Sequence, residues 1–291
     1  MAEPRTTLFI QSRTTDLGPV TVAYERKGTG ESVVLLHGLG SHRLVWEPVV
    51  PLLTEDREII AMDLPGFGES PDLNPGTPQD LDMTVAWLGS VFAALGVERP
   101  HVVGHSLGGL IALRLGQAGL ARSVTALAPA GFWTGVERRY AYAVMNAGRQ
   151  GARLVPQQAL EVLVRNPRAR AALASTLYGR SGLCPQHAAV RRTLRESAAF
   201  KAALRAGRAP VLFTGDIRDV PVTVAWGTRD RLLLPRQAGR VRAMIPNARL
   251  VPLHGCGHGP MRDAPELVAR TILRATGSEK WSPLRLGHVG G

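Results

Sequence analysis

The stretch His101-Val102-Val103-Gly104-His105-Ser106-Leu107-Gly108-Gly109 decides the fold. A short apolar run rich in β-branched residues ends at Gly104, and a run of helix-forming residues begins just after Ser106. The spacing Gly-x-Ser-x-Gly therefore predicts a serine at the tip of a tight strand-to-helix turn. Such a turn holds its central residue in a sparsely populated backbone conformation, and flanking glycines let the chain pass close on either side. We expect the Ser106 hydroxyl to stand clear of a sheet, beside the positive end of a helix.

Strand-like and helix-like segments alternate on both sides of this turn. Two pieces around the turn at 16–19 predict a β-hairpin. The predicted strands are 7–11, 20–26, 32–37, 58–62, 101–104, 124–128, 221–226 and 249–253, and the predicted helices are 43–53, 81–95, 107–117, 236–244 and 265–275. The pattern predicts an α/β fold with a mostly parallel sheet of roughly eight strands and helices on both faces.

The alternation stops at Pro129. Residues 133–213 are rich in Ala, Leu and Arg, with helical patches at 138–154, 157–164, 168–177 and 186–204. Because a structureless loop of this length is implausible in a compact domain, we interpret the segment as a helical insertion. The predicted organisation is a core formed by residues 1–131 and 215–278, a helical cap (lid) at 132–214, and a C-terminal tail at 279–291.

Composition limits the class of protein. The 291 residues are 45% hydrophobic and 20% charged, which is typical of a globular chain. No apolar run approaches the roughly 18 residues that a membrane helix needs, and the first residues lack a secretory signal, so we expect a cytoplasmic protein without a membrane partner. Cys184 and Cys256 are far apart and lack C-x-x-C spacing, which indicates neither a disulfide framework nor a zinc site.

The net charge of +12 and the pI near 11 raise the question of a nucleic-acid partner. The excess is nearly all arginine, since the lysines are Lys27, Lys201 and Lys280 only. It forms no single basic run. We therefore expect a solvated arginine-rich surface and no nucleic-acid partner.

Five segments, in this order, resemble the signatures of the α/β-hydrolase fold family. They are His37-Gly38-Leu39-Gly40, Asp63-Leu64-Pro65-Gly66-Phe67-Gly68-Glu69-Ser70, Gly104-His105-Ser106-Leu107-Gly108-Gly109, Trp226-Gly227-Thr228-Arg229-Asp230 and Gly255-Cys256-Gly257-His258. The resemblance runs from about residue 7 to 276. Within the family, the chain is similar to the capped bacterial group that includes esterases, lactonases, carbon–carbon bond hydrolases and cofactor-free perhydrolases.

A serine hydroxyl needs a base to become a nucleophile at neutral pH, and the base needs an acidic group to orient it. His258 lies on a glycine-flanked loop after the last predicted strand, and Asp230 lies on the loop after the preceding strand. The order Ser106, Asp230, His258 is the order of this fold. Because strand ends meet at one edge of a parallel sheet, we predict a catalytic triad of these three residues. Some family members place the acid after the earlier strand, but residues 128–131 contain no carboxylate here.

The resemblance also implies an oxyanion hole formed by the backbone N–H groups of Leu39 and Leu107. It implies that His37 and His105 shape loops rather than react. Asp63 is interpreted as a loop organiser.

No motif in the sequence defines the residues that contact the substrate. Trp133, Tyr140, Tyr142 and Met145 are candidates for a pocket lining, and the alternative is that they belong to an amphipathic helix that packs its apolar face. No cofactor and no metal site is expected, because no phosphate-cradling or metal-binding pattern occurs.

The leading hypothesis is therefore a serine hydrolase of the carboxylic-ester type (EC 3.1.1), which acts on a small-molecule ester-like carbonyl through an acyl-serine intermediate. A serine at position 106 differs from the aspartate that relatives resembling epoxide hydrolases or haloalkane dehalogenases carry there. Two alternatives stay open: a carbon–carbon bond (diketone) hydrolase or perhydrolase-type enzyme, and a slow-turnover hydrolase-like ligand receptor. The oligomeric state has no sequence signature here.

Overall fold

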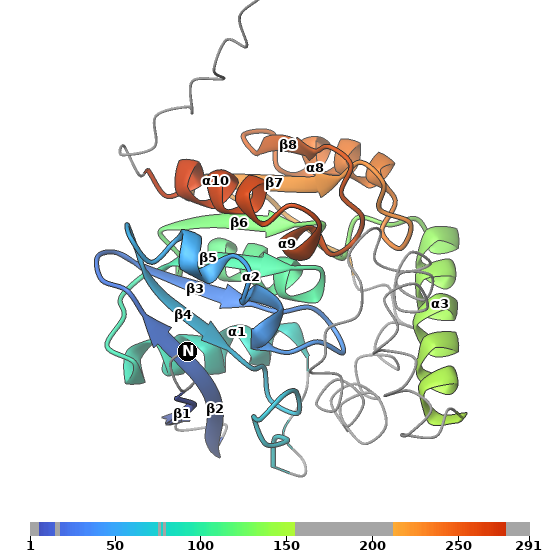
Figure 1. The fold of residues 1–291 in the computed structure, drawn as a ribbon. Helices are drawn as coiled ribbons and strands as arrows, with labels where there is room; N and C mark the ends of the chain where they lie inside the picture. Colours follow the sequence, from blue (N-terminus) through green and yellow to red (C-terminus); the bar gives the residue numbers. More distant parts are fainter. Residues whose placement is uncertain (1–5, 15–17, 75–76, 78–79, 155–211, 278–291) are drawn as a thin grey trace, which may run out of the picture.

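The computed structural model describes residues 6–14, 18–74, 77, 80–154 and 212–277. These residues form an open eight-stranded sheet in the order β1-β2-β4-β3-β5-β6-β7-β8 (Figure 1). The strands are β1 (Leu8–Thr14), β2 (Gly18–Lys27), β3 (Ser32–Leu36), β4 (Glu58–Met62), β5 (His101–His105), β6 (Ser123–Leu127), β7 (Val222–Gly227) and β8 (Arg249–Leu253). The hairpin β1–β2 is antiparallel, β2 pairs antiparallel with β4, and all other pairs are parallel. The predicted α/β class and mostly parallel sheet are confirmed.

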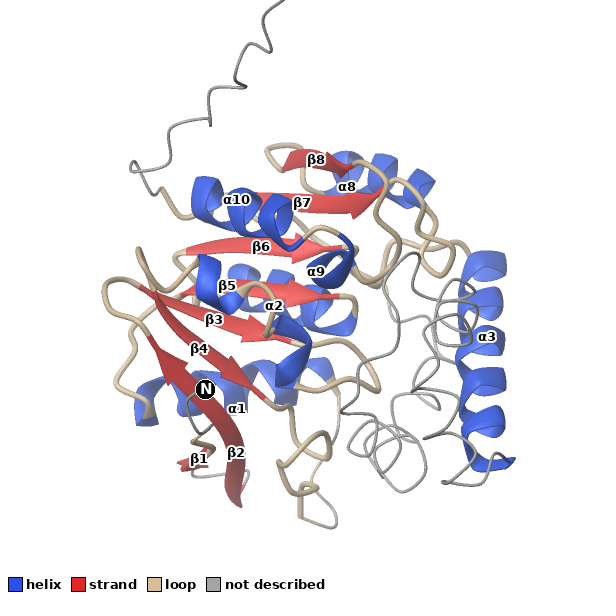
Figure 2. Cartoon of the chain, viewed as in Figure 1, coloured by secondary structure: helices blue, strands red, loops and turns tan. Residues whose placement is uncertain are grey.

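The central strands are buried on both faces. Successive side chains alternate between two hydrophobic clusters: Val34 and Leu36 of β3 belong to one, while Val33 and Leu35 belong to the other. This period of two is the geometry of a strand, and burial on both sides explains why the sequence of β3 is a continuous apolar run. Figure 2 shows helices on both sides of the sheet.

One cluster is covered by α1 (Leu81–Ala94), α2 (Leu107–Gln117) and α8 (Ala238–Met244), and the other by the 3-10 helices η1 (Arg43–Trp46) and η2 (Val50–Leu52) together with α10 (Pro265–Ala275). The continuous helix predicted at 43–53 is wrong. Pro51 lies in η2, and because proline lacks an N–H donor it cannot continue an α-helical hydrogen-bond ladder there. A 3-10 turn, η3 (Pro235–Gln237), precedes α8, and the short helix α9 (Pro260–Asp263) was not predicted.

The helix α3 (Gly135–Leu154) opens the predicted cap segment and stands beyond the ends of β3, β5, β6 and β7 to which the arrows point in Figure 1. Both ends of that segment lie together. The Phe213 N–H donates to the Gly131 carbonyl at 3.1 Å, and the rings of Phe132 and Phe213 stack with centroids 5.4 Å apart. The predicted helical patches at 157–164, 168–177 and 186–204, Cys184 and the tail at 279–291 lie outside the described residues.

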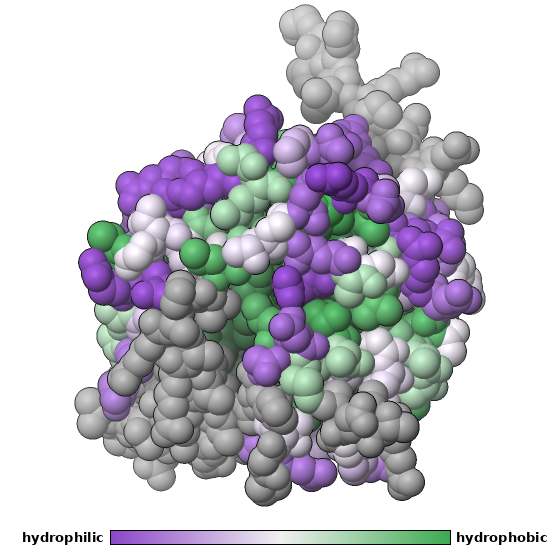
Figure 3. All heavy atoms as spheres, turned by 180° about the vertical axis from the view of Figure 1, so that it is seen from behind, coloured by the Kyte–Doolittle hydropathy of each residue, from purple (hydrophilic) through white to green (hydrophobic). Residues whose placement is uncertain are grey.

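The described surface mixes hydrophilic and hydrophobic residues. From behind, hydrophilic residues occupy much of the rim, and hydrophobic atoms are exposed in a band across the middle (Figure 3). Among the described residues, the large hydrophobic side chains that are exposed are Leu8 and Phe9 on β1, Leu52 on η2, Val136 and Tyr140 on α3, and Leu212. None of the described helices combines the length and the apolar character that crossing a bilayer requires.

The turn between β5 and α2 depends on a glycine that has no room for a side chain. A Cβ at Gly104 would overlap the carbonyl group of Gly108 in the first turn of α2. We therefore expect Gly104→Ala to lower the free energy of unfolding by about 1–3 kcal/mol, because backbone rather than a flexible side chain must move. Denaturant unfolding measures this loss.

Gly239→Ala is the matched control. A Cβ at Gly239 meets nothing within 4 Å, and the residue lies in α8, so this substitution should stabilise the protein by up to about 1 kcal/mol. Equal stability of Gly104→Ala and the unaltered protein would contradict the proposed close approach.

Candidate active site

Ser106 occupies the turn between β5 and α2 with φ 54° and ψ −114°. Its N–H donates to the Leu127 carbonyl at 2.9 Å, and its carbonyl accepts from the N–H groups of Leu110 and Ala130 at 3.1 and 3.0 Å. Backbone bonds to the neighbouring strand, to the helix and to the following loop thus hold a conformation that non-glycine residues rarely adopt. The side chain is partly exposed at the start of α2. The strained turn predicted from the sequence is confirmed.

Asp230 and His258 are brought together from the loops after β7 and β8. The His258 Nδ1 donates to the Asp230 Oδ2 at 2.8 Å, and both residues are buried. The other carboxylate oxygen of Asp230 accepts from the N–H groups of Leu232 and Leu233, each at 2.9 Å. With Nδ1 engaged by the carboxylate, the Nε2 atom of His258 is the ring nitrogen left for a reacting group.

His105, the residue before Ser106, links the loop of His258 to the serine turn. Its Nε2 donates to the His258 carbonyl at 2.6 Å, and the two imidazole rings lie 4.7 Å apart between centroids. Burial, and then the neighbouring His258, lower the pKa of His105 well below its ordinary value. His105 is therefore a neutral donor that fixes backbone, which is the role that the resemblance implied.

The loop after β3 lies against the turn. A Cβ at Gly38 would be 3.1 Å from the Ser106 Cβ. His37 donates from Nδ1 to the Gly38 carbonyl at 2.8 Å and accepts at Nε2 from the Leu64 N–H at 3.0 Å, which defines its tautomer. Burial lowers the pKa of His37, so it is neutral as well.

A buried carboxylate organises the next loop. Asp63 accepts from the Arg43 backbone N–H at 2.6 Å, from the Arg43 guanidinium and from the Glu69 N–H at 2.9 Å. These contacts join the loop after β4 to the segment that follows residues 37–42. Asp63 thus has the organising position expected of it.

Leu39 and Leu107, whose backbone N–H groups are the predicted oxyanion donors, both lie at this edge of the sheet. Leu107 is the first residue of α2, so its N–H has no partner within the helix. Leu39 follows Gly38 in the loop beside Ser106. In the described part of the chain neither group donates to a protein acceptor, which leaves both available to an oxygen placed near Ser106.

The predicted pocket residues have different environments. Trp133 is buried, and its ring lies 5.8 Å from that of Tyr142, edge to face. The half-exposed Tyr140 donates its hydroxyl to the Arg231 carbonyl at 2.9 Å, and Met145 packs against the core. A role of Trp133, Tyr140 and Met145 in substrate binding stays a prediction.

Sequence reasoning missed an ion-pair cluster that fixes the start of α3. Glu137 is buried in the first turn and accepts from Arg236 Nε at 2.6 Å and from Arg240 at 2.7 Å. Its carboxylate also accepts from the Thr134 N–H at 2.8 Å, while Thr134 Oγ1 accepts from the Glu137 N–H at 3.3 Å. The pattern Thr-x-x-Glu is a capping box, and this pattern in the sequence could have predicted the start of α3. The arginine partners, about 100 residues later, have no local signal.

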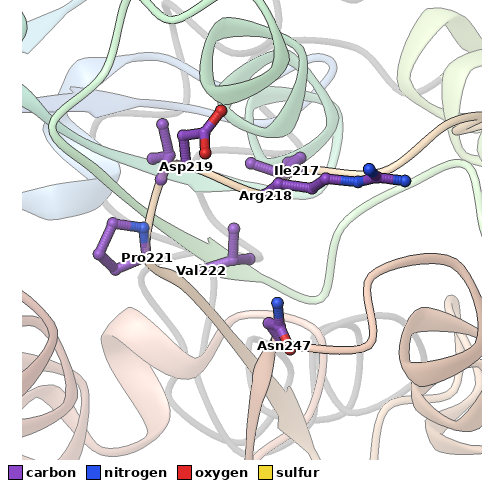
Figure 4. A pocket seen from close by; sticks show the side chains of 7 residues that line it. Ile217, Arg218, Asp219, Pro221, Val222 and Asn247 are labelled. Carbon is purple, nitrogen blue, oxygen red and sulfur yellow. The ribbon is translucent and has the colours of Figure 1, made fainter.

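A shallow pocket lies elsewhere, lined by residues 217–222 and Asn247 (Figure 4). These residues precede β7 and β8, so the pocket is at the opposite edge of the sheet from Ser106. It is therefore not part of the candidate site. The described residues contain no group of three or more His, Cys, Asp or Glu side chains suited to a metal ion.

A strained serine and a histidine bonded to a buried carboxylate thus lie on turns and loops at the carboxyl edge of a mostly parallel sheet. A family model described as the alpha/beta hydrolase family matches residues 33–271. The chain belongs to the alpha/beta hydrolase family, which confirms the family expected from the five sequence segments.

Similar proteins include esterases. A pimeloyl-[acyl-carrier protein] methyl ester esterase of Aeromonas hydrophila is 40% identical over 96 residues, which is 33% of this chain and 36% of that protein. The match therefore spans only about a third of the esterase. An uncharacterized protein of Mycobacterium tuberculosis is 26% identical over 257 residues, covering 84% of this chain and 74% of that one. The structure of a thermophilic esterase from Thermogutta terrifontis shares the fold, with TM-score 0.65, 22% identity, and coverage of 92% and 97% of the two chains.

The Glu137 cluster predicts a stability change. Burial alone would raise the pKa of Glu137, but the bonds from Arg240, Thr134 and Arg236 outweigh it and lower the pKa to about 2. Glu137→Gln should reduce the free energy of unfolding by about 1–3 kcal/mol at pH 7. Because the folded-state pKa lies below the ordinary 4.5, this loss should be constant above about pH 5 and shrink as the pH falls from 4.5 to 2.

Urea unfolding across this pH range measures the difference. Glu98→Gln, at an exposed residue after α1, is the control and should change stability by less than about 0.5 kcal/mol. A deficit for Glu137→Gln that stays constant down to pH 2 would show that the lost stability does not come from the carboxylate charge.

Proposed function

We propose that the protein is a serine hydrolase that cleaves ester-like carbonyl substrates through an acyl-serine intermediate. The observation that carries the proposal is the 2.8 Å hydrogen bond between His258 and the buried Asp230, on loops that meet the turn of Ser106. The buried carboxylate selects the tautomer of His258 and stabilises the imidazolium that forms during the reaction.

In the proposed reaction the Ser106 Oγ attacks the carbonyl carbon while the His258 Nε2 takes its proton. The leaving alcohol receives that proton and departs, which leaves an acyl group on Ser106. Water then gives a proton to the same nitrogen as it attacks the acyl carbon. The bond between that carbon and the Ser106 Oγ breaks, and the Oγ takes the proton back from His258, which releases the acid and restores the serine. One histidine serves both halves, because each half moves a single proton to and from the same position.

The backbone N–H groups of Leu39 and Leu107 are proposed to stabilise the oxyanion of both tetrahedral intermediates. Loss of one such donor costs about 2.7–4 kcal/mol in comparable sites. His105 supports the arrangement indirectly, since its bond to the His258 carbonyl couples the histidine loop to the serine turn.

The similarity to an acyl-carrier-protein methyl ester esterase supports ester chemistry for this chain, although the match covers part of that protein. The residues do not separate esters from diketones, so a carbon–carbon bond hydrolase or a perhydrolase-type enzyme stays the alternative within enzymes. A receptor that retains slow turnover is the alternative outside them. Repeated turnover favours an enzyme, whereas one equivalent of product favours a receptor.

Ser106→Ala should abolish hydrolysis of 4-nitrophenyl acetate, with kcat reduced by about 10⁴- to 10⁶-fold, and should also prevent covalent labelling by a fluorophosphonate. The labelled peptide of the unaltered protein, read by mass spectrometry, should contain residue 106. Ser90→Ala, on α1, is the control and should be labelled normally. Labelling of Ser106→Ala at the normal rate would refute the nucleophile.

Asp230→Asn should leave the fold intact and lower kcat by about 10⁴-fold, because an amide favours the wrong histidine tautomer. Asp219→Asn is the matched control: Asp219 is exposed and precedes β7, at the opposite edge of the sheet. Steady-state kinetics and thermal unfolding are measured together. A kcat for Asp230→Asn within tenfold of the unaltered protein would remove Asp230 from the triad.

A further inference from the structure

The loop that carries His258, residues 255–259 (the histidine loop), is rich in glycine. Gly257 and Gly259 lie directly on either side of His258, and glycine leaves the backbone more freedom than any other residue. A side chain that transfers a proton must nevertheless be held within roughly 0.5 Å of its productive position. Contacts outside the imidazole ring therefore have to fix the backbone around His258.

Asp263 bonds to the residues on both sides of His258. Its Oδ2 accepts from the Gly257 N–H at 2.7 Å, and its own N–H donates to the Gly259 carbonyl at 3.2 Å. The His258 carbonyl between them accepts from His105. Backbone groups of three successive residues are thus engaged, and the bond to the carboxylate is of the stronger, charge-assisted kind.

Asp263 is itself fixed to the hydrophobic core. It is the last residue of α9, in which Met261 is fully buried, and α10 begins two residues later. Met261 belongs to the same hydrophobic cluster as Ile272 of α10. Because a packed core resists displacement, the carboxylate of Asp263 is a rigid acceptor for the Gly257 N–H.

The beginning of the histidine loop is held by a different set of bonds. The Arg229 N–H donates to the Cys256 carbonyl at 2.8 Å, and Thr228 Oγ1 accepts from the Gly255 N–H at 2.9 Å. These bonds join residues 255 and 256 to the loop that carries Asp230. The bonds of Asp263 complete this arrangement at residues 257 and 259.

We propose that Asp263 is a positioning residue for the hydrolysis: by holding the Gly257 N–H, its carboxylate keeps the His258 ring where Nε2 can take the proton of Ser106. This inference rests on the proposed serine hydrolase and deepens it. Asp263 acts through His258 and touches neither the substrate nor a reacting atom. A displacement of about 1 Å, even when caused far from the chemistry, can cost on the order of 100-fold in rate.

The proposal predicts a loss of rate without a loss of affinity. Asp263→Ala removes the acceptor and should lower kcat for 4-nitrophenyl acetate by about 30- to 100-fold. Because one histidine serves both half-reactions, both should slow together, and KM should stay within about threefold. The rate constant for inactivation by a fluorophosphonate should fall by a similar factor, since that reaction also needs the base.

Asp263→Asn tests the hydrogen bond apart from the charge. Asparagine has nearly the same shape and keeps a side-chain oxygen that can accept from the Gly257 N–H. A neutral acceptor is weaker than a carboxylate, so kcat should stay within about fivefold of the value for the unaltered protein. Asp263→Leu, which has a similar shape but no acceptor, replaces Asp263→Ala if that variant does not fold.

Asp216→Ala is the matched control. The Asp216 Oδ1 accepts from the Ile217 N–H, also at 2.7 Å, and the residue precedes β7 at the opposite edge of the sheet. This variant loses a bond of the same kind, but its kcat should change less than about twofold. Thermal unfolding of all variants is measured beside the kinetics, which are recorded well below the lowest midpoint.

The outcomes are distinct. A kcat for Asp263→Ala within about threefold of the unaltered protein overturns the proposal and leaves the hydrolase intact. Equal losses in Asp263→Ala and Asp263→Asn also overturn it, because charge rather than the hydrogen bond would then act. An equal loss in Asp216→Ala overturns it as well, since general destabilisation would be responsible. Full activity of Ser106→Ala, or no turnover by the unaltered protein, refutes the proposed hydrolase itself.

Discussion

The close approach between β5 and the first turn of α2 is the constraint on which the rest of the site depends. Because Gly104 has no Cβ, the carbonyl group of Gly108 can lie where a side chain would otherwise be. That contact brings the helix start directly over the strand end, and Ser106 must turn through a positive φ to connect them. A relaxed serine would need a wider connection, which would move the Leu107 N–H away from the serine hydroxyl. The strain at Ser106 and the position of the Leu107 N–H, the proposed oxyanion donor, therefore have a common origin.

The other loops are held against this turn through backbone atoms. His105 donates to the His258 carbonyl and His37 accepts from the Leu64 N–H, each on a neighbouring loop, and burial keeps both rings neutral. A charged ring in either place would pay a desolvation cost, and a charged His37 could no longer accept from the Leu64 N–H. His258 is different, because its Nδ1 meets a carboxylate rather than a carbonyl. Among these histidines it is the one bonded to a carboxylate, which is the arrangement that the proposed base requires.

The sequence was sufficient to predict those elements whose structure depends on residues close together in the chain. Buried parallel strands need continuous apolar runs, so β3 and β4 could be predicted almost residue by residue. The steric needs of the Ser106 turn are visible in the sequence as the spacing of its glycines. Residues 43–53 carry apolar residues at helical spacing, but that spacing does not distinguish an α-helix from successive 3-10 turns when proline interrupts the ladder. The partners of Glu137 depend on how α3 packs on η3 and α8, which only the tertiary fold determines.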